Sequence, residues 1–527
     1  MVIRHTRARP SAPALLGPEE SLDYAALGRR VAVLAAGLRA AGVLSGDRVA
    51  LRIENSVAFV TTALACMWLG APFVPISVED PEARAKRALA DCSPRVVVTR
   101  ATSEAATSAP PRPAASPAPA VPTAPEVPTA PEVPAPTWLA YEQLLELGAQ
   151  YAPGPGPPAT SPDRLAYIIY TSGTTGAPKG VSISRGAMSW SVGQSARSLG
   201  YGPSSRSLAV SAFHFDGSYS NLFSTLHAGG LLVIPRRPEL LFLRPFFDTV
   251  LQQDITHTTF SPSYLRLLLA SRHLGRLADS RLAVMGLGGE ELIASDLRKL
   301  WAAVPRLRIF NLYGPTECTI SVTCFEVTVE ALGSGRVPLG TPNEGVGFHV
   351  VDGAGAEVGD GRVGELYISG RQLMAGYWGD ATLSRAVLTD TVVAGRLCYR
   401  TGDLVFRDAD GLYFYAGRVD DVVKRNGVRI SLSEVAGALG QLPGVRAAVC
   451  AMFRLDGRHG IAAFVVADRS APEGSHEPGR LLEGLRQHLP LTMVPDQVHF
   501  VDELPLTSSG KTDRSRLLSC FGLEPAR

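Results

Sequence analysis

The sequence predicts an α/β protein with parallel sheets and a small separate domain near its C-terminal end. Residues 24–43 carry Leu and Val at spacings of three and four, which is typical of an amphipathic helix. Two short apolar runs, 49–53 and 165–169, are typical of strands, and 57–69 of another helix. This alternation favours parallel sheets covered by helices. About a hundred residues with their own helix and strand signals follow 417–421, enough for a small domain.

Composition indicates a large soluble enzyme of two to four domains, because domains average roughly 150 residues and the chain has 527. Hydrophobic residues make up 46% and charged residues 19%, enough for a sizeable core. The net charge of +2 gives no reason to expect nucleic acid or an anionic membrane as partner. Seven cysteines without a C-x-x-C pair indicate neither a disulfide framework nor a zinc site. No signal peptide or membrane-spanning run is recognised, so we expect a cytoplasmic protein.

One segment, 101–137, differs from the rest in composition. It is dominated by Pro, Ala, Thr and Ser and contains the tandem repeat Val121-Pro-Thr-Ala-Pro-Glu126 and Val127-Pro-Thr-Ala-Pro-Glu132. Such a composition buries too little apolar surface to offset the entropy of ordering. We therefore expect a disordered insertion, with a Pro-rich recognition site as the alternative.

The most informative stretch is Tyr170-Thr-Ser-Gly-Thr-Thr-Gly-Ala-Pro-Lys-Gly180, which follows the apolar run 165–169. Glycines let backbone N–H groups turn toward an anion, hydroxyls add donors, and Lys179 adds charge. This favours a phosphate site over a flexible surface turn. An ordinary P-loop is excluded, because that motif needs Gly-Lys-[Ser/Thr] and here Lys179 lies between Pro178 and Gly180.

Further motifs accompany this loop in a fixed order along the chain: Gly70-Ala-Pro-Phe-Val-Pro-Ile76, Phe213-His-Phe-Asp-Gly-Ser218, Gly288-Gly-Glu290, Asn311-Leu-Tyr-Gly-Pro-Thr-Glu317, Gly364-Glu-Leu-Tyr-Ile-Ser-Gly370, Tyr399-Arg-Thr-Gly-Asp-Leu404 and Leu504-Pro-Leu-Thr-Ser-Ser-Gly-Lys-Thr-Asp-Arg514. Together they resemble the adenylate-forming superfamily, and most closely the amino-acid adenylation domains of nonribosomal peptide synthetases. The resemblance covers nearly the whole chain outside the insertion. It implies a large N-terminal domain, 1–418, of parallel-sheet α/β subdomains plus a β-barrel-like subdomain, and a small mobile α+β domain, 419–527.

The resemblance also implies residues that bind ATP and AMP. Tyr313 would stack on adenine, Thr316 would reach the α-phosphate, and Asp403 would accept the ribose hydroxyls with help from Arg418. Glu317 would help hold Mg²⁺, a hard cation that prefers carboxylate and phosphate oxygens. The full predicted set is Thr171, Ser172, Gly173, Thr174, Thr175, Gly176, Lys179, Gly289, Glu290, Asn311, Tyr313, Gly314, Thr316, Asp403 and Arg418. In isolation each side chain has a plainer reading, as core aromatic, turn former or solvated carboxylate; the joint pattern favours the site.

Two further residues would serve the reaction cycle. The family's C-terminal lysine, which contacts the substrate carboxylate and the α-phosphate, maps to Lys511, and a point charge suits developing anions. The hinge about which the small domain rotates between half-reactions maps to Asp420. The plainer readings are a solvated surface lysine and a turn former.

The substrate class depends on Asp216. In amino-acid-activating relatives an aspartate at this position pairs with the substrate ammonium, and a buried Asp without a cation would be costly; the alternative is an Asp that caps its own turn. The remaining pocket positions by alignment are uncharged, and we expect a bulky neutral side chain, for which the glycines leave room: Gly217, Ser220, Thr259, Gly286, Gly288, Leu312, Ile320 and Ser321.

The expected acceptor is the phosphopantetheine thiol of a separate carrier protein, since no carrier, condensation or thioesterase motif follows Arg514. Coenzyme A is the alternative acceptor. One departure concerns the loop at 424–429, where Asn426 precedes the glycine at a position that relatives usually fill with Arg. The competing functions are an acyl- or aryl-CoA synthetase, which Asp216 speaks against, and an inactive adenylate-binding scaffold.

Overall fold

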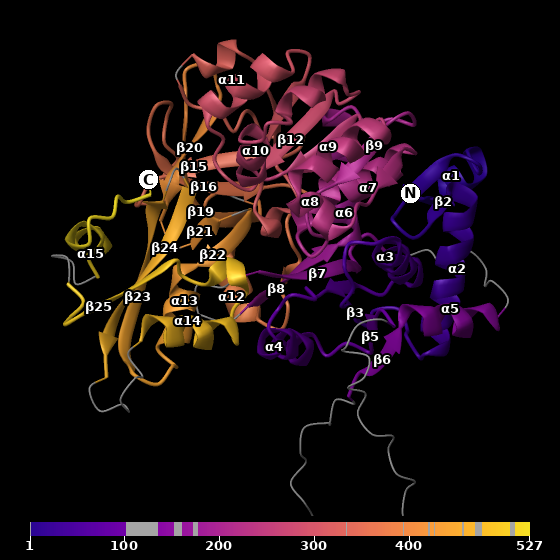
Figure 1. The fold of residues 1–527 in the computed structure, drawn as a ribbon, viewed down its shortest axis with the longest axis horizontal. Helices are drawn as coiled ribbons and strands as arrows, with labels where there is room; N and C mark the ends of the chain where they lie inside the picture. The colour runs from indigo at the N-terminus through magenta and orange to yellow at the C-terminus, as the bar shows by residue number, and fades with distance from the viewer. Residues whose placement is uncertain are drawn as a thin grey trace, which may run out of the picture.

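The computed structural model describes residues 2–101, 135–151, 161–171, 178–333, 335–393, 395–419, 422–425, 427–455, 458–468, 477–505 and 512–526. In this part of the chain there are two large sheets, whose strands interleave along the sequence, and a third sheet. The last hundred residues form a smaller group of elements (Figure 1). The predicted mixed α/β architecture is confirmed.

The first large sheet is parallel in its interior and antiparallel at both edges, in the order β14-β13-β12-β11-β9-β10-β1-β2. Its strands are β1 (Pro13–Leu16), β2 (Ser21–Asp23), β9 (Arg206–Ala209), β10 (Leu231–Val233), β11 (His257–Phe260), β12 (Val284–Gly288), β13 (Arg308–Tyr313) and β14 (Thr323–Val327). The helices that follow these strands along the chain are α7 (Tyr219–Ala228), α8 (Arg237–Leu241), α9 (Leu243–Gln252), α10 (Pro262–Leu269) and α11 (Ala294–Ala303).

The second large sheet has the order β17-β8-β7-β4-β3-β5-β6, with β3 to β7 parallel and β8 and β17 antiparallel. Its strands are β3 (Val49–Leu51), β4 (Phe73–Pro75), β5 (Val96–Thr99), β6 (Thr137–Ala140), β7 (Leu165–Thr171), β8 (Lys179–Ser184) and β17 (Gly376–Tyr377). Its helices are α1 (Val2–Ala8), α2 (Tyr24–Ala40), α3 (Val57–Leu69), α4 (Glu82–Cys92), α5 (Tyr141–Ala149) and α6 (Arg185–Ser198). The predicted helices and strands of this region are therefore present: α2 and β3 end earlier than expected, α3 has the expected bounds, and β7 extends to Thr171.

The third sheet is antiparallel and lies where the barrel-like subdomain was expected. It contains β15 (Gly347–Val351), β16 (Gly364–Ser369), β18 (Leu388–Thr389), β19 (Cys398–Arg407) and β20 (Tyr413–Arg418), with α12 (Ala381–Val387) beside it. The C-terminal unit, which we define as the described residues from Val422 onward, contains two further sheets. Their strands and helices are β21 (Val422–Arg425), β22 (Val428–Ser431), α13 (Leu432–Leu439), β23 (Val445–Leu455), β24 (Arg458–Ala467), α14 (Pro478–Arg486), β25 (Gln497–Val501) and α15 (Arg514–Cys520).

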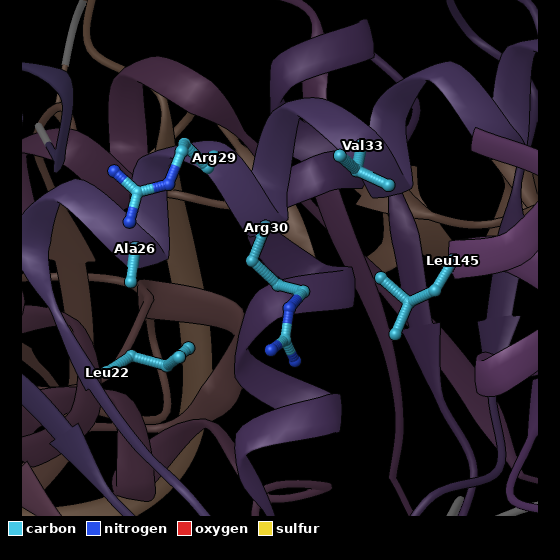
Figure 2. A pocket seen from close by; sticks show the side chains of 6 residues that line it. All are labelled: Leu22, Ala26, Arg29, Arg30, Val33 and Leu145. Carbon is cyan, nitrogen blue, oxygen red and sulfur yellow. The ribbon is translucent and has the colours of Figure 1, made fainter. Parts of the chain in front are cut away.

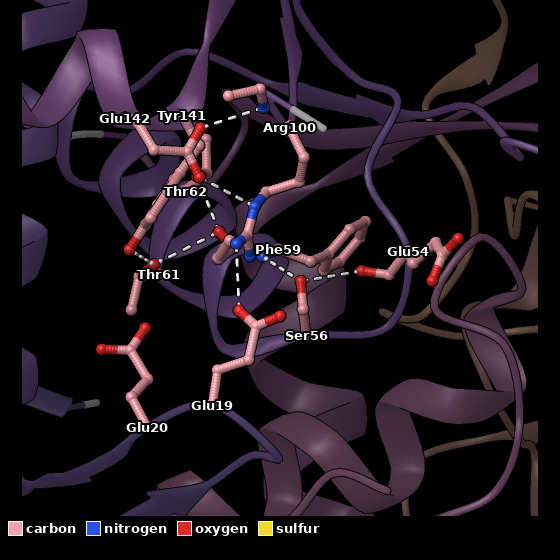
Figure 3. A network of polar contacts seen from close by, with 12 residues as sticks. Glu19, Glu20, Glu54, Ser56, Phe59, Thr61, Thr62, Arg100, Tyr141 and Glu142 are labelled. Atoms are coloured by element: carbon pink, nitrogen blue, oxygen red, sulfur yellow. Dashed lines mark hydrogen bonds and ion pairs between the residues drawn. The ribbon is translucent and has the colours of Figure 1, made fainter. Parts of the chain in front are cut away.

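The predicted insertion leaves and re-enters the fold between two neighbouring parallel strands, β5 and β6. Residues 102–134 lie outside the described part, and β6 begins at Thr137. Figure 3 shows the polar network at the point of departure, where Arg100 pairs with Glu19 at 3.0 Å and with Glu142 at 2.9 Å. The backbone N–H of Ala101 also donates to Glu142. These contacts hold the end of β5 in register.

A surface pocket of about 270 Å³ lies over α2 and α5, lined by Leu22, Ala26, Arg29, Arg30, Val33 and Leu145 (Figure 2). It contains none of the residues predicted for the site. None of the helices within the described ranges combines the length and apolar character that crossing a bilayer requires.

Candidate active site

The predicted site residues gather where strands of the two large sheets end. Thr259, Gly288 and Tyr313 lie at or near the carboxyl ends of β11, β12 and β13, and Thr171 is the last residue of β7. The carboxyl ends of parallel strands are where α/β sheets bind ligands. The arrangement therefore follows from the parallel pairing that the sequence predicts.

Asp216 begins the short 3₁₀ turn Asp216–Ser218 and is only 8% exposed. Its carboxylate accepts hydrogen bonds from the Thr316 hydroxyl at 3.1 Å and from the backbone N–H of Ile320 at 3.2 Å. Burial raises the pKa of Asp216 to about 6, against the partial opposition of these bonds. Within the described residues no Lys, Arg or His forms an ion pair with Asp216. The turn-cap alternative is incomplete, because besides the backbone of Gly217 two donors come from a segment a hundred residues away.

The turn that supplies these donors is strained. Thr319 and Ile320 have φ angles of 56° and 70°, which β-branched residues rarely adopt. Such residues persist only where their surroundings determine the backbone, and here Thr319 donates to the carbonyl oxygen of Gln372 at 2.7 Å while Ile320 donates to Asp216. Gly314 permits the close approach of this turn, because a Cβ there would lie 2.7 Å from the Cα of Ser321.

The pocket positions beside Asp216 form a compact group. The Ser220 hydroxyl donates to the carbonyl oxygen of Gly217 at 2.7 Å and lies 3.4 Å from the hydroxyl oxygen of Thr259. Ser220 and Thr259 are both buried, as are Ile320 and Ser321. A Cβ at Gly217 would meet nothing within 4 Å, so there is open space at this position.

The expectation that the other two glycines also leave room is wrong. A Cβ on Gly286 would lie 2.8 Å from Cγ2 of Thr259 and 2.9 Å from Cδ1 of Leu312. A Cβ on Gly288 would lie 2.6 Å from the carbonyl oxygen of Leu312. Neighbouring side chain and backbone atoms therefore lie close to both glycines.

A second group joins β13 to β19. The Tyr313 hydroxyl donates to Asp403 at 2.5 Å, and Arg418 forms an ion pair with the other carboxylate oxygen of Asp403 and donates to the carbonyl oxygen of Thr401. Asp403 and Tyr313 are buried. Asn311 is also buried, and its side-chain amide donates to the carbonyl oxygen of Pro338 at 2.7 Å. The structure therefore brings together the residues predicted for adenine and ribose.

The predicted metal ligand, Glu317, is 1% exposed and lies close to the predicted phosphate lysine. Tyr377 connects them: its hydroxyl donates to Glu317 at 2.8 Å, and Lys179 lies over its ring, with Nζ 5.2 Å from the centroid. Pairing of β17 with β8 places Tyr377 beside Lys179. The sequence analysis missed Tyr377, which sits in a Gly-Tyr-Trp stretch without a recognisable motif.

Arg429 is a second residue that the sequence analysis did not assign to the site. Its Nη1 lies 3.0 Å and 3.1 Å from the two carboxylate oxygens of Glu317. Burial opposes ionisation of Glu317, but the Arg429 charge and the hydrogen bonds to the carboxylate outweigh it and hold the pKa of Glu317 below its usual value. A signal for Arg429 was present in the sequence, because this residue lies in the stretch 424–429 in which Asn426 departs from the family pattern.

Glu290 also faces the C-terminal unit. It accepts hydrogen bonds from the hydroxyl and the backbone N–H of Ser263, at 2.6 Å and 3.0 Å, and from the backbone N–H of Gly427. Gly289, with a φ of 88°, lies against Gly427, which a Cβ would approach to 3.6 Å. These two predicted nucleotide residues therefore form the surface against which Gly427 lies.

Some predicted residues lie outside the described part: Ser172, Gly173, Thr174, Thr175, Gly176, Asp420 and Lys511. The flanks of the Gly/Thr loop are described. Thr171 ends β7 opposite Lys179 on β8, and its buried hydroxyl has no partner among the described residues. An unsatisfied hydroxyl at the entrance to this loop fits a site that awaits an acceptor such as phosphate.

The donor set around Glu317 bears on the predicted Mg²⁺. Among the described residues there is no group of three or more His, Cys, Asp and Glu that could enclose a metal. A single buried carboxylate fits the usual Mg²⁺ arrangement, in which one or two carboxylates and the phosphates of a nucleotide supply the ligands. Glu317 thus suits a metal that arrives with ATP.

The family model for AMP-binding enzymes matches residues 2–378, and that for the AMP-binding enzyme C-terminal domain matches residues 434–511. The chain belongs to the AMP-binding enzyme family. This confirms the predicted membership of the adenylate-forming superfamily.

The relatives include a phenyloxazoline synthase and a novobiocin biosynthesis protein. The chain is 32% identical to phenyloxazoline synthase MbtB of Mycobacterium tuberculosis, over 99% of this chain and 34% of that protein. It is 32% identical to novobiocin biosynthesis protein H of Streptomyces niveus, over 98% of this chain and 81% of that protein. The chain thus spans about a third of the length of the MbtB relatives and most of the Streptomyces protein.

Solved structures share the fold over nearly the whole chain. Holo-PA1221, a nonribosomal peptide synthetase protein containing adenylation and PCP domains, has a TM-score of 0.79 and 25% identity, covering 98% of this chain and 83% of that one. The o-succinylbenzoate CoA synthetase of Bacillus subtilis has a TM-score of 0.81 at 20% identity, covering 98% and 97%. The second likeness shows the fold alone.

Proposed function

We propose that this chain activates an amino acid with ATP, forming an aminoacyl-AMP and releasing pyrophosphate, and then transfers the aminoacyl group to the phosphopantetheine thiol of a carrier protein supplied in trans. The observation that carries the amino-acid assignment is Asp216. It is a buried carboxylate whose described donors, Thr316 and Ile320, are both neutral. Burial of an unpaired charge is costly, and a substrate ammonium would pair it.

The nucleotide would lie between the group of residues around Asp403 and the group around Lys179. Asp403 has the carboxylate for the ribose hydroxyls, with Tyr313 beside it at the adenine and Arg418 holding it in place. Thr171, Lys179 and the Gly/Thr loop would bind the β- and γ-phosphates that leave as pyrophosphate. Charge develops on phosphoryl oxygens in such a transfer, so positioned cations and N–H donors supply the catalysis.

Lys511 is the proposed catalytic residue, placed between the substrate carboxylate and the α-phosphate when the C-terminal unit rotates about Asp420. Thr316, whose hydroxyl donates to Asp216 here, would reach the α-phosphate. Glu317 would hold Mg²⁺ together with the phosphates. The ion would neutralise the developing charge on the phosphoryl oxygens.

The proposed substrate has a neutral side chain, because none of the pocket positions carries charge. The filled space at Gly286 and Gly288 revises the expected size downward: the side chain extends toward Gly217, past the hydroxyls of Ser220 and Thr259. These hydroxyls favour a side chain with a polar group of its own.

Support for a carrier-protein acceptor comes from the relatives, since PA1221 combines adenylation and PCP domains. An acyl- or aryl-CoA synthetase is the second candidate, which the buried carboxylate of Asp216 speaks against. The deciding experiment is substrate-dependent ATP–pyrophosphate exchange over proteinogenic and modified amino acids, aryl acids and fatty acids. Exchange with one neutral amino acid supports the proposal, and exchange only with acids that lack an amino group contradicts it.

A further inference from the structure

The strands that carry the predicted phosphate residues have a second face, turned away from the site. Thr171 pairs with Lys179 across β7 and β8, and β17 places Tyr377 on the other side of β8. Successive side chains along a strand point to opposite faces of the sheet. The next residues along these strands therefore share the opposite face, which we call the back face: Tyr170, Gly180 and Trp378.

Helix α4 ends against this back face. The Tyr170 hydroxyl donates to a carboxylate oxygen of Asp91 at 2.5 Å, and the indole N–H of Trp378 donates to the backbone carbonyl oxygen of Asp91 at 3.2 Å. Gly180 lies close to both partners, because a Cβ there would lie 3.1 Å from Cβ of Trp378 and 3.3 Å from Cε1 of Tyr170. One residue in the last turn of α4 thus contacts both β7 and the residue that follows β17.

Arg48, just before β3, holds the end of α4 in this position. Its Nε and Nη2 donate to the carbonyl oxygens of Cys92 and Ser93, each at 2.8 Å. The last carbonyl oxygens of a helix lack N–H partners within it, and a cation there is favourable. The guanidinium of Arg48 also lies over the ring of Trp378, 5.2 Å from the centroid. Contacts outside the site therefore fix the position of Asp91.

The face toward the site carries the groups that would meet the phosphates. The buried hydroxyl of Thr171 has no partner among the described residues, and Nζ of Lys179 lies 5.2 Å from the ring centroid of Tyr377. Phosphoryl transfer depends on the positions of such groups, because catalysis is mostly positioning and electrostatic stabilisation. Each of these residues is bonded directly to a back-face residue, so a shift of one face also moves the other.

We propose that Asp91 is a positioning residue for the β- and γ-phosphates of ATP: it holds Tyr170 and Trp378 on the back face and thereby aligns Thr171 and Lys179 on the face toward the site. This rests on the proposed function, which assigns these phosphates to Thr171 and Lys179. Asp91 acts through the strands and not by contact with the nucleotide. AMP has neither of these phosphates, so its binding is independent of Asp91.

The test measures binding to the full chain by calorimetry, with Mg²⁺ and without amino acid, for α,β-methylene-ATP, inorganic pyrophosphate and AMP. Tyr170→Phe and Asp91→Ala each remove the same hydrogen bond. We expect either variant to bind the analogue and pyrophosphate about two- to tenfold more weakly, the net contribution of one such bond, and to bind AMP as the wild type does. The double variant should be no weaker than Asp91→Ala alone. Asp91→Asn keeps an acceptor oxygen and should recover most of the affinity.

Tyr24→Phe is the matched control. It makes the same change as Tyr170→Phe, but the bond that it removes joins α2 to the carbonyl oxygen of Gly230 at 2.9 Å. It should leave all three affinities unchanged. The proposal is overturned if Asp91→Ala binds pyrophosphate as tightly as the wild type, or if its affinity for AMP falls in the same proportion, as a general loss of stability would cause. Failure of the wild-type chain to bind the ATP analogue would instead contradict the proposed function.

Discussion

Replacement of Asp216 by Asn tests the amino-acid assignment, because it removes the charge and keeps the shape. Truncating one member of a buried, hydrogen-bonded charge pair costs about 2–5 kcal/mol of binding. At about 1.4 kcal/mol per factor of ten, kcat/KM for the amino acid should fall by roughly 30-fold to several thousand-fold. Binding of ATP alone should change little, since Asp216 contacts Thr316 but neither Asp403 nor Glu317.

The same substitution should stabilise the protein in the absence of substrate. The pKa of Asp216 rises from 3.8 to about 6, mainly through burial, and two units correspond to about 3 kcal/mol. Because the folded pKa lies above the unfolded one, folding favours the protonated form, and ionised Asp216 destabilises the fold above pH 6. Asn removes this term. Its amide can offer oxygen to the N–H of Ile320 and N–H to the Thr316 hydroxyl, so both contacts can persist.

ATP–pyrophosphate exchange and the thermal midpoint at pH 7.5 together measure the two effects. Asp410→Asn, at an exposed carboxylate, is the control and should alter neither. A variant that keeps wild-type exchange would refute the ammonium assignment. A variant that loses exchange but also melts earlier would show that Asp216 mainly holds the turn at Ile320 together.

Four further outcomes are expected. For the wild type, KM for the amino acid should rise about tenfold per pH unit below about pH 6, because the protonated carboxyl no longer pairs with ammonium, and Asp216→Asn should lack this dependence. Leu312→Ala should open the space over Gly286 and shift the exchange profile toward larger side chains, with total exchange retained. Asp403→Asn should weaken binding of ATP by at least tenfold in calorimetry, through loss of a charge-assisted hydrogen bond. Lys511→Ala should abolish adenylate formation while calorimetry still detects ATP.

Much of the fold, the group of residues around Asp216 and the group around Tyr313 could be predicted from local patterns. Apolar runs and amphipathic spacing predict the strands and helices of a parallel sheet, and parallel strands present their carboxyl ends at one edge. Tyr313 and Asp216 each follow or adjoin such an end. The resemblance to the adenylate-forming superfamily implies that Tyr313 and Asp403 serve the same nucleotide, and the structure joins these two residues directly although they are 90 residues apart.

The missed features depend on distances that no local pattern encodes. Gly286 was expected to widen the pocket because it has no side chain, but its neighbours on β11 and β13 lean into the vacated space. Whether these neighbouring side chains reach the space beside Gly286 depends on the strand register and on their rotamers, which a local sequence pattern does not show. Arg429 meets Glu317 only because the C-terminal unit docks with β22 inward, and neither residue's surroundings in sequence predict its partner.

The site contains three buried carboxylates, and their neighbours separate their roles. Asp403 meets Arg418 and Tyr313, which satisfy one side of the carboxylate and hold its orientation. Glu317 meets Arg429, a cation that the C-terminal unit supplies. Asp216 meets only neutral donors among the described residues. Burial without a neighbouring cation raises its pKa. Environments that shift the pKa values of like groups in different directions give these groups different roles within a site. The carboxylate without a protein cation among the described residues is the one positioned to select a cationic substrate.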